Sequence, residues 1–242
     1  PDGSAAFVVQ QRKRATVPGS RGWLEVRLDD ITMGRVMFEL VTAEGAIVVD
    51  ESVTTGRGFF PYSAGAPPHD WLNNMGGSIG FGGPVAVGAA VACPDRPVVA
   101  LIGDGTAMYT IQALWSMARE NLHVVSIIFN NASYSVLNVE LERVGADSGG
   151  VKARSQLDLN GPRLNFAQLA QGMGVHAVRT NTAEDFTKAL EYALATPGPH
   201  LIEALVPESL SGVKRRVLPW LLRSLPNLPL PLAQALKRKV AP

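Results

Sequence analysis

Short apolar runs alternate with helix-like stretches along most of the chain. Runs of Val, Ile, Leu and Ala predict buried strands, whereas longer segments with apolar positions at helical spacing predict helices. The expected strands cover residues 46–49, 98–102, 124–129, 176–179 and 200–206, and the expected helices cover residues 31–41, 82–91, 109–120, 166–172 and 182–195. This alternation predicts an α/β fold, in which a parallel sheet of five or six strands carries helices on both faces.

The two ends of the chain differ from this alternating region. Residues 1–28 are polar and basic, and a break at Pro18-Gly19-Ser20 favours a linker or poorly ordered arm. Residues 208–242 form a basic tail rich in Pro and Leu, whose prolines interrupt any long amphipathic helix. We therefore expect a single domain over residues 29–207 with flexible ends, and we do not expect the tail to bind a membrane.

Composition excludes several classes of function. The 242 residues carry a net charge of +1, but residues 29–207 hold 10 basic and 18 acidic groups, which argues against a nucleic-acid partner. No apolar run is long enough to span a membrane, and no secretory signal opens the sequence. A single cysteine, Cys93, excludes an internal disulfide framework and favours a cytoplasmic location.

Two polar motifs follow neighbouring predicted strands. Gly103-Asp104-Gly105 comes after the strand at 98–102, and Asn130-Asn131 comes after the strand at 124–129, with 24 residues between the motifs. Because parallel sheets bind ligands at the carboxyl ends of their strands, the carboxylate and the amide oxygen are expected to meet. Such hard oxygen donors suit Mg²⁺, which shares its coordination shell with phosphate groups. The pair of motifs therefore predicts a site for magnesium and a diphosphate.

The spacing of the two motifs resembles that of the thiamin diphosphate (ThDP) enzymes. The resemblance implies that Mg²⁺ is held by Asp104, the side chain of Asn131 and the main-chain carbonyl of Ser133. It also implies that the cofactor is contacted by Val53, Thr54, Gly103, Gly105, Thr106 and Tyr134. Two of these residues have a second interpretation, because Thr54 equally suits a capped helix start and Tyr134 equally suits a place in the core.

A glycine-rich segment upstream extends the resemblance to the rest of the cofactor. Residues 76–83 contain five glycines around one isoleucine, and they are similar to the GSIGF segment of ThDP decarboxylases. The resemblance implies that the Gly77 carbonyl meets the 4′-amino group of the cofactor, that Ser78 lies beside it, and that Ile79 supports the bent cofactor from below. Glycine is required at the contact because a side chain would keep the backbone away from the pyrimidine ring.

Other segments narrow the resemblance to the acetolactate synthase large-subunit-like and benzoylformate decarboxylase-like group. These segments cover residues 50–58, 69–72, 108–115 and 199–204. The implied activity is decarboxylation or carboligation of a 2-oxo acid, with C–C bond cleavage or formation through a ThDP adduct. Pyruvate decarboxylases carry a catalytic glutamate where this chain has Leu137, which favours an apolar or aromatic 2-oxo acid or a second carbonyl substrate. The segment 135–140 matches acetolactate synthases proper poorly.

One essential group is missing from the predicted site. In ThDP enzymes a glutamate activates the cofactor from a pyrimidine-binding domain, usually of a second subunit, and Glu51 is interpreted here as structural. The chain is therefore expected to hold half of a site and to work with a pyrimidine-binding domain of the same or another chain in a homo-oligomer. The alternative is a non-catalytic ThDP-binding or assembly module. His69, near the glycine-rich segment, is the histidine candidate for catalysis, and the glycine-rich connection 138–165 is expected to be a lid loop.

Overall fold

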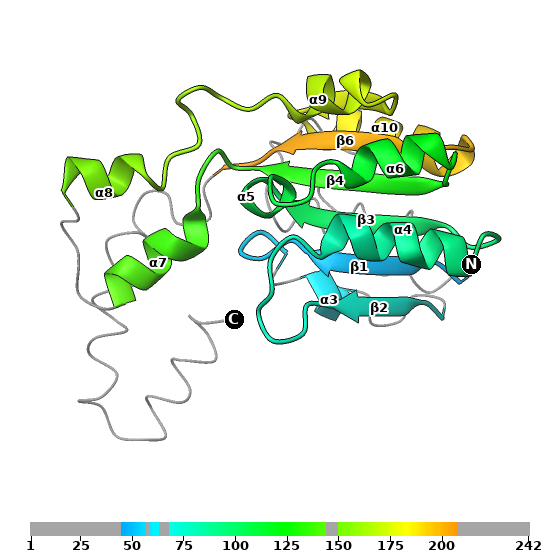
Figure 1. Cartoon of the computed structure of the whole chain (residues 1–242), viewed down its shortest axis with the longest axis horizontal. Coiled ribbons are helices and arrows are strands. Elements are labelled where there is room, and N and C mark those ends of the chain that lie inside the picture. Colours follow the sequence, from blue (N-terminus) through cyan, green and yellow to red (C-terminus); the bar gives the residue numbers. More distant parts are fainter. Residues whose placement is uncertain (1–44, 57–58, 63–67, 144–149, 208–242) are drawn as a thin grey trace, which may run out of the picture.

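The computed structural model describes residues 45–56, 59–62, 68–143 and 150–207 (Figure 1). Six parallel strands form one sheet in the order β2-β1-β3-β4-β6-β5. The strands are β1 (Ile47–Glu51), β2 (Asp70–Asn73), β3 (Val98–Gly103), β4 (Val124–Asn130), β5 (His176–Thr180) and β6 (His200–Leu205). The predicted α/β fold with a parallel sheet is confirmed.

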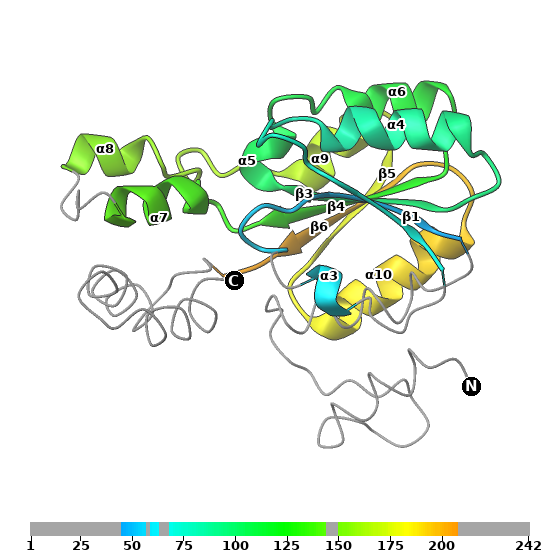
Figure 2. The ribbon, with the colours of Figure 1, turned by 90° about the horizontal axis from the view of Figure 1, so that it is seen from below.

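Helices cover both faces of the sheet (Figure 2). One face carries α4 (Gly82–Ala92), α6 (Ala113–Arg119) and α9 (Phe166–Gly172), and the other carries α3 (Phe59–Tyr62) and α10 (Ala183–Ala195). The small side chains of α4, among them buried Ala86 and Ala90, allow this helix to lie close to the strands. On the opposite face, Phe186 and Leu190 of α10 are fully buried against the sheet. The strands therefore have apolar side chains on both faces, as expected for a buried parallel sheet.

The strand register brings three carboxyl ends together. Glu51 at the end of β1 pairs with Ile102, and Gly103 at the end of β3 pairs with Phe129 of β4. The short helix α5 (Asp104–Ala107) follows β3 directly. The segments that follow β1, β3 and β4 consequently start from the same edge of the sheet, where α/β proteins place their ligands.

Three details differ from the sequence-based expectation. The edge strand β2 was not predicted, because most of its residues are exposed and it lacks an apolar run. The connection 138–165 is not an irregular loop throughout, since it contains most of α7 (Ser135–Arg143) and all of α8 (Val151–Ser155). The helix expected at 109–120 begins only at Ala113, after a series of turns.

Some expectations fall outside the described residues. These are the helix at 31–41, the arm at 1–28 and the basic tail at 208–242, so the proposed domain limits of 29–207 stay predictions. Within the part of the chain that the structure describes, no helix is long and apolar enough to cross a membrane.

Candidate functional site

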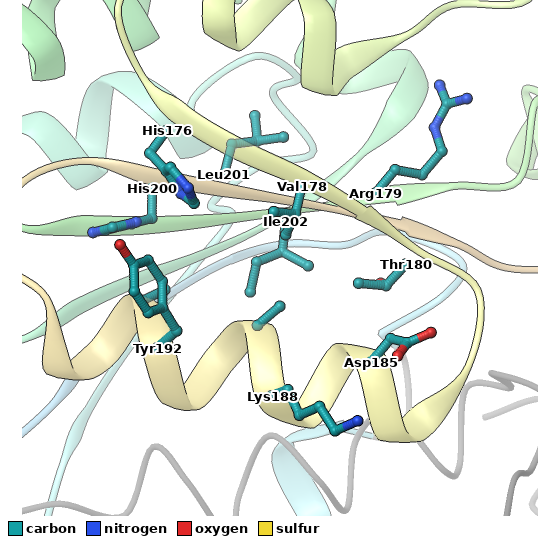
Figure 3. A pocket seen from close by; sticks show the side chains of 12 residues that line it. His176, Val178, Arg179, Thr180, Asp185, Lys188, Tyr192, His200, Leu201 and Ile202 are labelled. Carbon is teal, nitrogen blue, oxygen red and sulfur yellow. The ribbon is translucent and has the colours of Figure 1, made fainter.

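A cavity of about 420 Å³ lies between β5, β6 and α10, away from the predicted site (Figure 3). The rings of His176, Tyr192 and His200 gather at one end of it, with centroids 5.3 to 5.7 Å apart. His200 is bound through Nε2 to the carbonyl oxygen of Thr196, at 2.9 Å. None of the residues predicted to bind the cofactor or metal lines this cavity.

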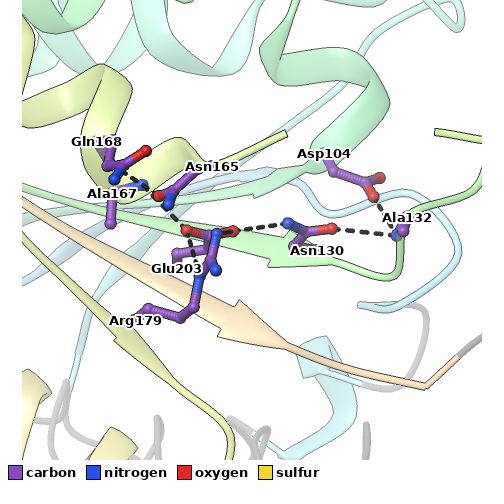
Figure 4. A network of polar contacts seen from close by, with 8 residues as sticks. All are labelled: Asp104, Asn130, Ala132, Asn165, Ala167, Gln168, Arg179 and Glu203. Carbon is purple, nitrogen blue, oxygen red and sulfur yellow. Dashed lines mark hydrogen bonds and ion pairs between the residues drawn. The ribbon is translucent and has the colours of Figure 1, made fainter. Parts of the chain in front are cut away.

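The two halves of the predicted metal site meet at the carboxyl ends of β3 and β4 (Figure 4). Asp104 is almost completely buried, and its Oδ2 accepts a hydrogen bond of 2.7 Å from the main-chain N–H of Ala132. The same N–H lies 3.1 Å from Oδ1 of Asn130, so one donor is shared between the two motifs. The other carboxylate oxygen of Asp104 accepts the N–H of Gly105 at 2.8 Å. The structure thus brings the Gly-Asp-Gly and Asn-Asn motifs into direct contact.

Burial changes the charge properties of Asp104. Desolvation raises the pKa of its carboxyl to about 6, although hydrogen bonds from main-chain N–H groups, including those of Gly105 and Ala132, act in the opposite direction. An ionised carboxylate at this place is costly without a nearby positive charge. A divalent cation would offset that cost, so the donor chemistry fits Mg²⁺.

The segment after β4 presents the other predicted metal ligands. Oδ1 of Asn131 accepts the N–H of Ser133 at 3.0 Å, and the Ser133 carbonyl accepts the N–H of Ser135 at 2.8 Å. A carbonyl oxygen has two lone pairs, so the Ser133 carbonyl retains capacity for one further partner. Ala132 has a φ of 55°, in the left-handed region, and this turns the chain sharply between the two ligands.

Gly105 and Tyr134 are in close contact beside Asp104. A Cβ atom built on Gly105 would lie 2.6 Å from a carbon of the Tyr134 ring, so only glycine fits under this ring. Tyr134 is half-buried and its ring lies against Gly105, while its contact with the cofactor stays a prediction. Thr106 donates its hydroxyl to the carbonyl of Gly103 at 3.0 Å, which fixes the first turn after the strand.

The glycine-rich segment lies at the same edge of the sheet, beside β1. Gly77 has a φ of 73°, and a Cβ atom added to it would meet nothing within 4 Å. Ile79 is 48% exposed, and Ser78 contacts only Asn74 among the hydrogen-bond partners found in the described residues. The backbone at Gly77 and the side chain of Ile79 are therefore accessible from outside the domain.

Glu51 anchors the glycine-rich segment from beneath. Its carboxylate accepts the main-chain N–H groups of Gly80, of Phe81 at 3.2 Å and of Gly82 at 2.7 Å, where α4 begins. Burial raises the pKa of Glu51, while these three hydrogen bonds lower it. Because its oxygens are occupied by main-chain donors, Glu51 has a structural role, as interpreted from the sequence. That it holds the glycine-rich segment was not foreseen.

Val53 and Thr54 lie in a tight turn directly after β1. The N–H of Thr55 donates to the Ser52 carbonyl at 3.1 Å, and Val53 at the apex has a φ of 52°. This conformation is strained for a β-branched residue, and such strain is concentrated at ligand sites. Thr54 does not cap a helix, because the next described helix, α3, begins at Phe59.

The structure places His69 away from these groups. His69 precedes β2, and its neighbour Asp70 pairs with Ile47 at the amino end of β1. The ring lies 6.2 Å from that of Trp71 in an edge-to-face arrangement. Since Asp104, Asn131 and Glu51 lie at the opposite edge of the sheet, the structure does not bring His69 to the candidate site.

Comparisons with known proteins agree with this geometry. Residues 57–204 match the family described as thiamine pyrophosphate enzyme, C-terminal TPP binding domain. The chain is 57% identical over 165 residues to IlvX of Mycobacterium tuberculosis, which is provisionally named an acetolactate synthase large subunit; the match covers 68% of this chain and 32% of IlvX. It is 36% identical over 170 residues to the benzoylformate decarboxylase of Pseudomonas aeruginosa, covering 69% of this chain and 31% of that enzyme.

A solved structure agrees with these sequence matches. The thiamine diphosphate-dependent 4-hydroxybenzoylformate decarboxylase of Rhodococcus jostii RHA1 superposes with a TM-score of 0.64 at 34% identity, over 76% of this chain and 33% of that one. The chain spans about a third of the length of the relatives that it matches. By sequence match and by fold, the chain belongs to the family of thiamin diphosphate enzymes and carries their C-terminal cofactor-binding domain.

Proposed function

We propose that this chain is the Mg²⁺–ThDP-binding half of a 2-oxo acid decarboxylase or carboligase. The observation that carries the proposal is the contact between Asp104 and the Asn130–Ala132 turn, which joins the two motifs into one site. In this proposal Asp104, the Asn131 side chain and the Ser133 carbonyl hold Mg²⁺. Asp104 is the charged ligand, and its buried position gives the cation its strongest attraction in the site.

The remaining residues orient the cofactor. Gly105, Thr106 and the strained turn at Val53 and Thr54 provide main-chain and hydroxyl groups for the diphosphate, while Gly103 lets the backbone approach. Gly77 and Ser78 face the aminopyrimidine end, and Ile79 supports it. Bound ThDP would supply an electron sink for the bond next to the substrate carbonyl.

The activating glutamate is proposed to come from a pyrimidine-binding domain of the same or another chain. Two glutamates are buried in the described residues, and both are occupied: Glu51 by three main-chain N–H groups and Glu203 by Arg179, Asn130 and Ala167. Ile79 in the glycine-rich segment is exposed, and so is Tyr109, whose side chain lies against Gly80. Apolar side chains grouped in this way favour a surface that a second domain or subunit covers, as in a homo-oligomer.

The substrate is proposed to be a 2-oxo acid with an apolar or aromatic side chain. Leu137 lies in the first turn of α7, three residues after the proposed ligand Tyr134, and is 46% exposed. Relatives named for benzoylformate and 4-hydroxybenzoylformate act on aromatic 2-oxo acids, which agrees with an apolar residue here.

The free Cys93 fits a reducing compartment, and we propose a cytoplasmic location on that basis.

Calorimetric titration of the chain with ThDP and Mg²⁺ tests the proposal, followed by assays with pyruvate and benzoylformate. We expect ThDP to bind only when Mg²⁺ is present, and turnover to appear only after a polypeptide carrying the family's pyrimidine-binding domain is added. Absence of Mg²⁺-dependent ThDP binding would contradict the whole proposal. Binding without turnover in the paired sample would favour the alternative of a non-catalytic cofactor-binding module.

A further inference from the structure

A buried carboxylate on β6 has no place in the site described so far. Glu203 is fully buried, yet its neighbours on the strand, Ile202 and Ala204, are buried apolar residues. Its oxygens accept four hydrogen bonds (Figure 4). The donors are Nδ2 of Asn130 at 2.7 Å, the N–H of Ala167 at 3.0 Å, and Nε and Nη2 of Arg179 at 3.0 and 2.9 Å.

The sheet register explains how these side chains meet. Arg179 on β5 pairs with Glu203, and Ile128 on β4 pairs with Glu203 from the other side. Asn130 lies two residues beyond Ile128 and therefore points to the same face of the sheet. The three polar side chains form a row across three adjacent strands, under the amino end of α9.

Glu203 contacts both ends of the segment that carries the proposed metal ligands. Asn130 is the last residue of β4, and Ala167 lies in the first turn of α9. The Glu203 carboxylate therefore contacts the residues at both ends of the connection between β4 and α9. Within that connection the N–H of Leu159 donates to the Ala132 carbonyl at 2.9 Å, and the N–H of Tyr134 donates to Leu157 at 2.9 Å. Residues 157–159 of the connection therefore lie beside the turn that carries the proposed metal ligands.

Asn130 connects Glu203 to the turn at Asn131–Ser133 that follows β4. Its Nδ2 is held by Glu203, which leaves Oδ1 directed at the N–H of Ala132, the group that Asp104 also accepts. A rotation of the Asn130 amide would remove one of the two acceptors that hold Ala132 in its left-handed conformation. The adjacent Asn131 and Ser133 would then lose their orientation.

We propose that Glu203 is a positioning residue for the metal and diphosphate site, acting through Asn130 and Ala167. The inference rests on the proposed function, because it concerns the ligands of that same site. A buried ionised group is costly unless it is fully paired, and replacing a whole buried ion pair with apolar residues often leaves stability unchanged or higher. The four well-directed donors favour a role in orientation, since groups that hold metal ligands in place affect metal affinity strongly.

The test compares E203Q with the unchanged chain in two measurements. Glutamine keeps the shape but turns one oxygen into an N–H donor, which faces either Asn130 and Arg179 or Ala167 and Arg179, all of which already donate. We expect the Mg²⁺ concentration for half-maximal ThDP binding to rise about 10- to 100-fold. In the cofactor-free chain, we expect hydrogen exchange to rise at least about tenfold at the amides of residues 131–135, because the turn loses its fixed acceptor.

Three further variants separate positioning from general stability. Q171L removes the hydrogen bond of 3.1 Å from Gln171 to the Ala177 carbonyl, a tie between α9 and β5 in the same layer that does not touch Asn130. It should leave the Mg²⁺ requirement and the exchange of residues 131–135 unchanged. N130A should match E203Q, and the double variant should show no more than about a twofold further change, since the two residues act as one unit.

The outcomes decide the inference separately from the proposed function. Equal Mg²⁺ requirement and equal exchange in E203Q and the unchanged chain would overturn it, as would additive effects of E203Q and N130A. If E203Q does not fold, E203D replaces it, because aspartate keeps the charge that pairs with Arg179 but is one methylene shorter and cannot reach both Asn130 and Ala167; an unchanged exchange at 131–135 would again overturn the inference. An unchanged chain that binds no Mg²⁺–ThDP would contradict the proposed function, while the exchange measurement would still decide the role of Glu203.

Discussion

Three buried carboxylates lie in or beside the proposed site, and each accepts at least one main-chain N–H group. The Asp104 carboxylate accepts the N–H groups of Gly105 and Ala132. The carboxylates of Glu51 and Glu203 accept N–H groups at the amino ends of α4 and α9. A helix amino end leaves its first N–H groups unpaired and attracts negative charge. At the scale of single residues, the loops of the site are therefore held from below by charged acceptors.

Glu51 provides a direct test of this arrangement. In E51Q one acceptor oxygen becomes a donor, so at least one of the N–H groups of Gly80, Phe81 and Gly82 is left unpaired in a buried place. An unsatisfied buried donor costs about 1–3 kcal/mol. We expect urea unfolding to show a loss of that size, and calorimetry to show weaker ThDP binding.

T187V is the control for Glu51. It removes a buried hydroxyl that donates to the Ala183 carbonyl at 2.8 Å on α10, remote from the glycine-rich segment. Its ThDP affinity should equal that of the unchanged chain even if its stability falls. Unaltered stability and affinity in E51Q would show that the glycine-rich segment is held by other contacts.

Gly105 is constrained by packing. G105A would place a methyl group 2.6 Å from the Tyr134 ring, which has to move. Overpacking of this kind costs about 1–3 kcal/mol, and here it would also displace the loop that is proposed to bind the diphosphate. Urea unfolding should therefore show a clear loss for G105A, whereas G150A, where an added Cβ meets nothing within 4 Å, should stay within about 0.5 kcal/mol of the unchanged chain. Equal stability of the two variants would refute this explanation.

The sequence revealed those site residues that neighbour a recognisable motif. Asp104 and Asn131 follow apolar strands at a diagnostic spacing, so their meeting could be predicted. The contacts of Glu51 and Glu203 could not, because their partners lie 24 to 73 residues away and depend on strand register. The left-handed conformation of Val53 was also hidden, since a β-branched residue gives no local signal for it.

At the scale of elements, apolar patterning predicted five of the six strands but missed the edge strand β2 and the helix α7. β3, β4 and β6 are buried on both faces, so their sequences are nearly continuous apolar runs. β2 forms only four pairs at the sheet edge and keeps polar residues. α7 packs few side chains against the core and contains several charges, which made its sequence typical of a loop.

The amino ends of β5 and β6 predict a pH effect on stability. Burial lowers the pKa of His200 below its ordinary value of 6.5, and the nearby His176 and His123 contribute in the same direction. A depressed pKa means that the unfolded chain binds the proton more readily than the folded chain. Stability from neutral His200 is therefore complete above pH 6.5 and decreases as the pH falls through the folded pKa.

Substitution H200Q should remove this dependence. Glutamine cannot take up the proton but can still donate to the Thr196 carbonyl, which His200 contacts at 2.9 Å. The free energy of unfolding, measured in urea from pH 8 to pH 5, should fall more steeply for the unchanged chain than for H200Q as the pH falls. A difference that is constant over this range would exclude His200 as the cause.

At the scale of the whole molecule, the domain gathers its site from residues that are far apart in sequence. The ends of β1, β3 and β4 contribute Val53, Asp104 and Asn131, and these groups come together only in the folded sheet. Ligands of such a site bind the native state and not the unfolded chain, so binding stabilises the fold. The stability of the whole chain therefore reports on the site even without turnover.

Mg²⁺ and ThDP together should raise the free energy of unfolding of the 242-residue chain, by about 2.7 kcal/mol at a ligand concentration 100 times the dissociation constant. Chelation of Mg²⁺ with EDTA should abolish the increase, because the diphosphate would then face the buried Asp104 carboxylate without a cation between them.

The variant D104A should abolish the increase as well. D70N alters an exposed carboxylate that is paired with Arg96 at the other edge of the sheet, and it should retain the increase. H69N should also retain it, since His69 lies at that same remote edge. Thermal or urea unfolding with each ligand alone and with both measures these effects, and an increase that persists in EDTA or in D104A would mean that ThDP binds somewhere other than the Asp104–Asn131 site.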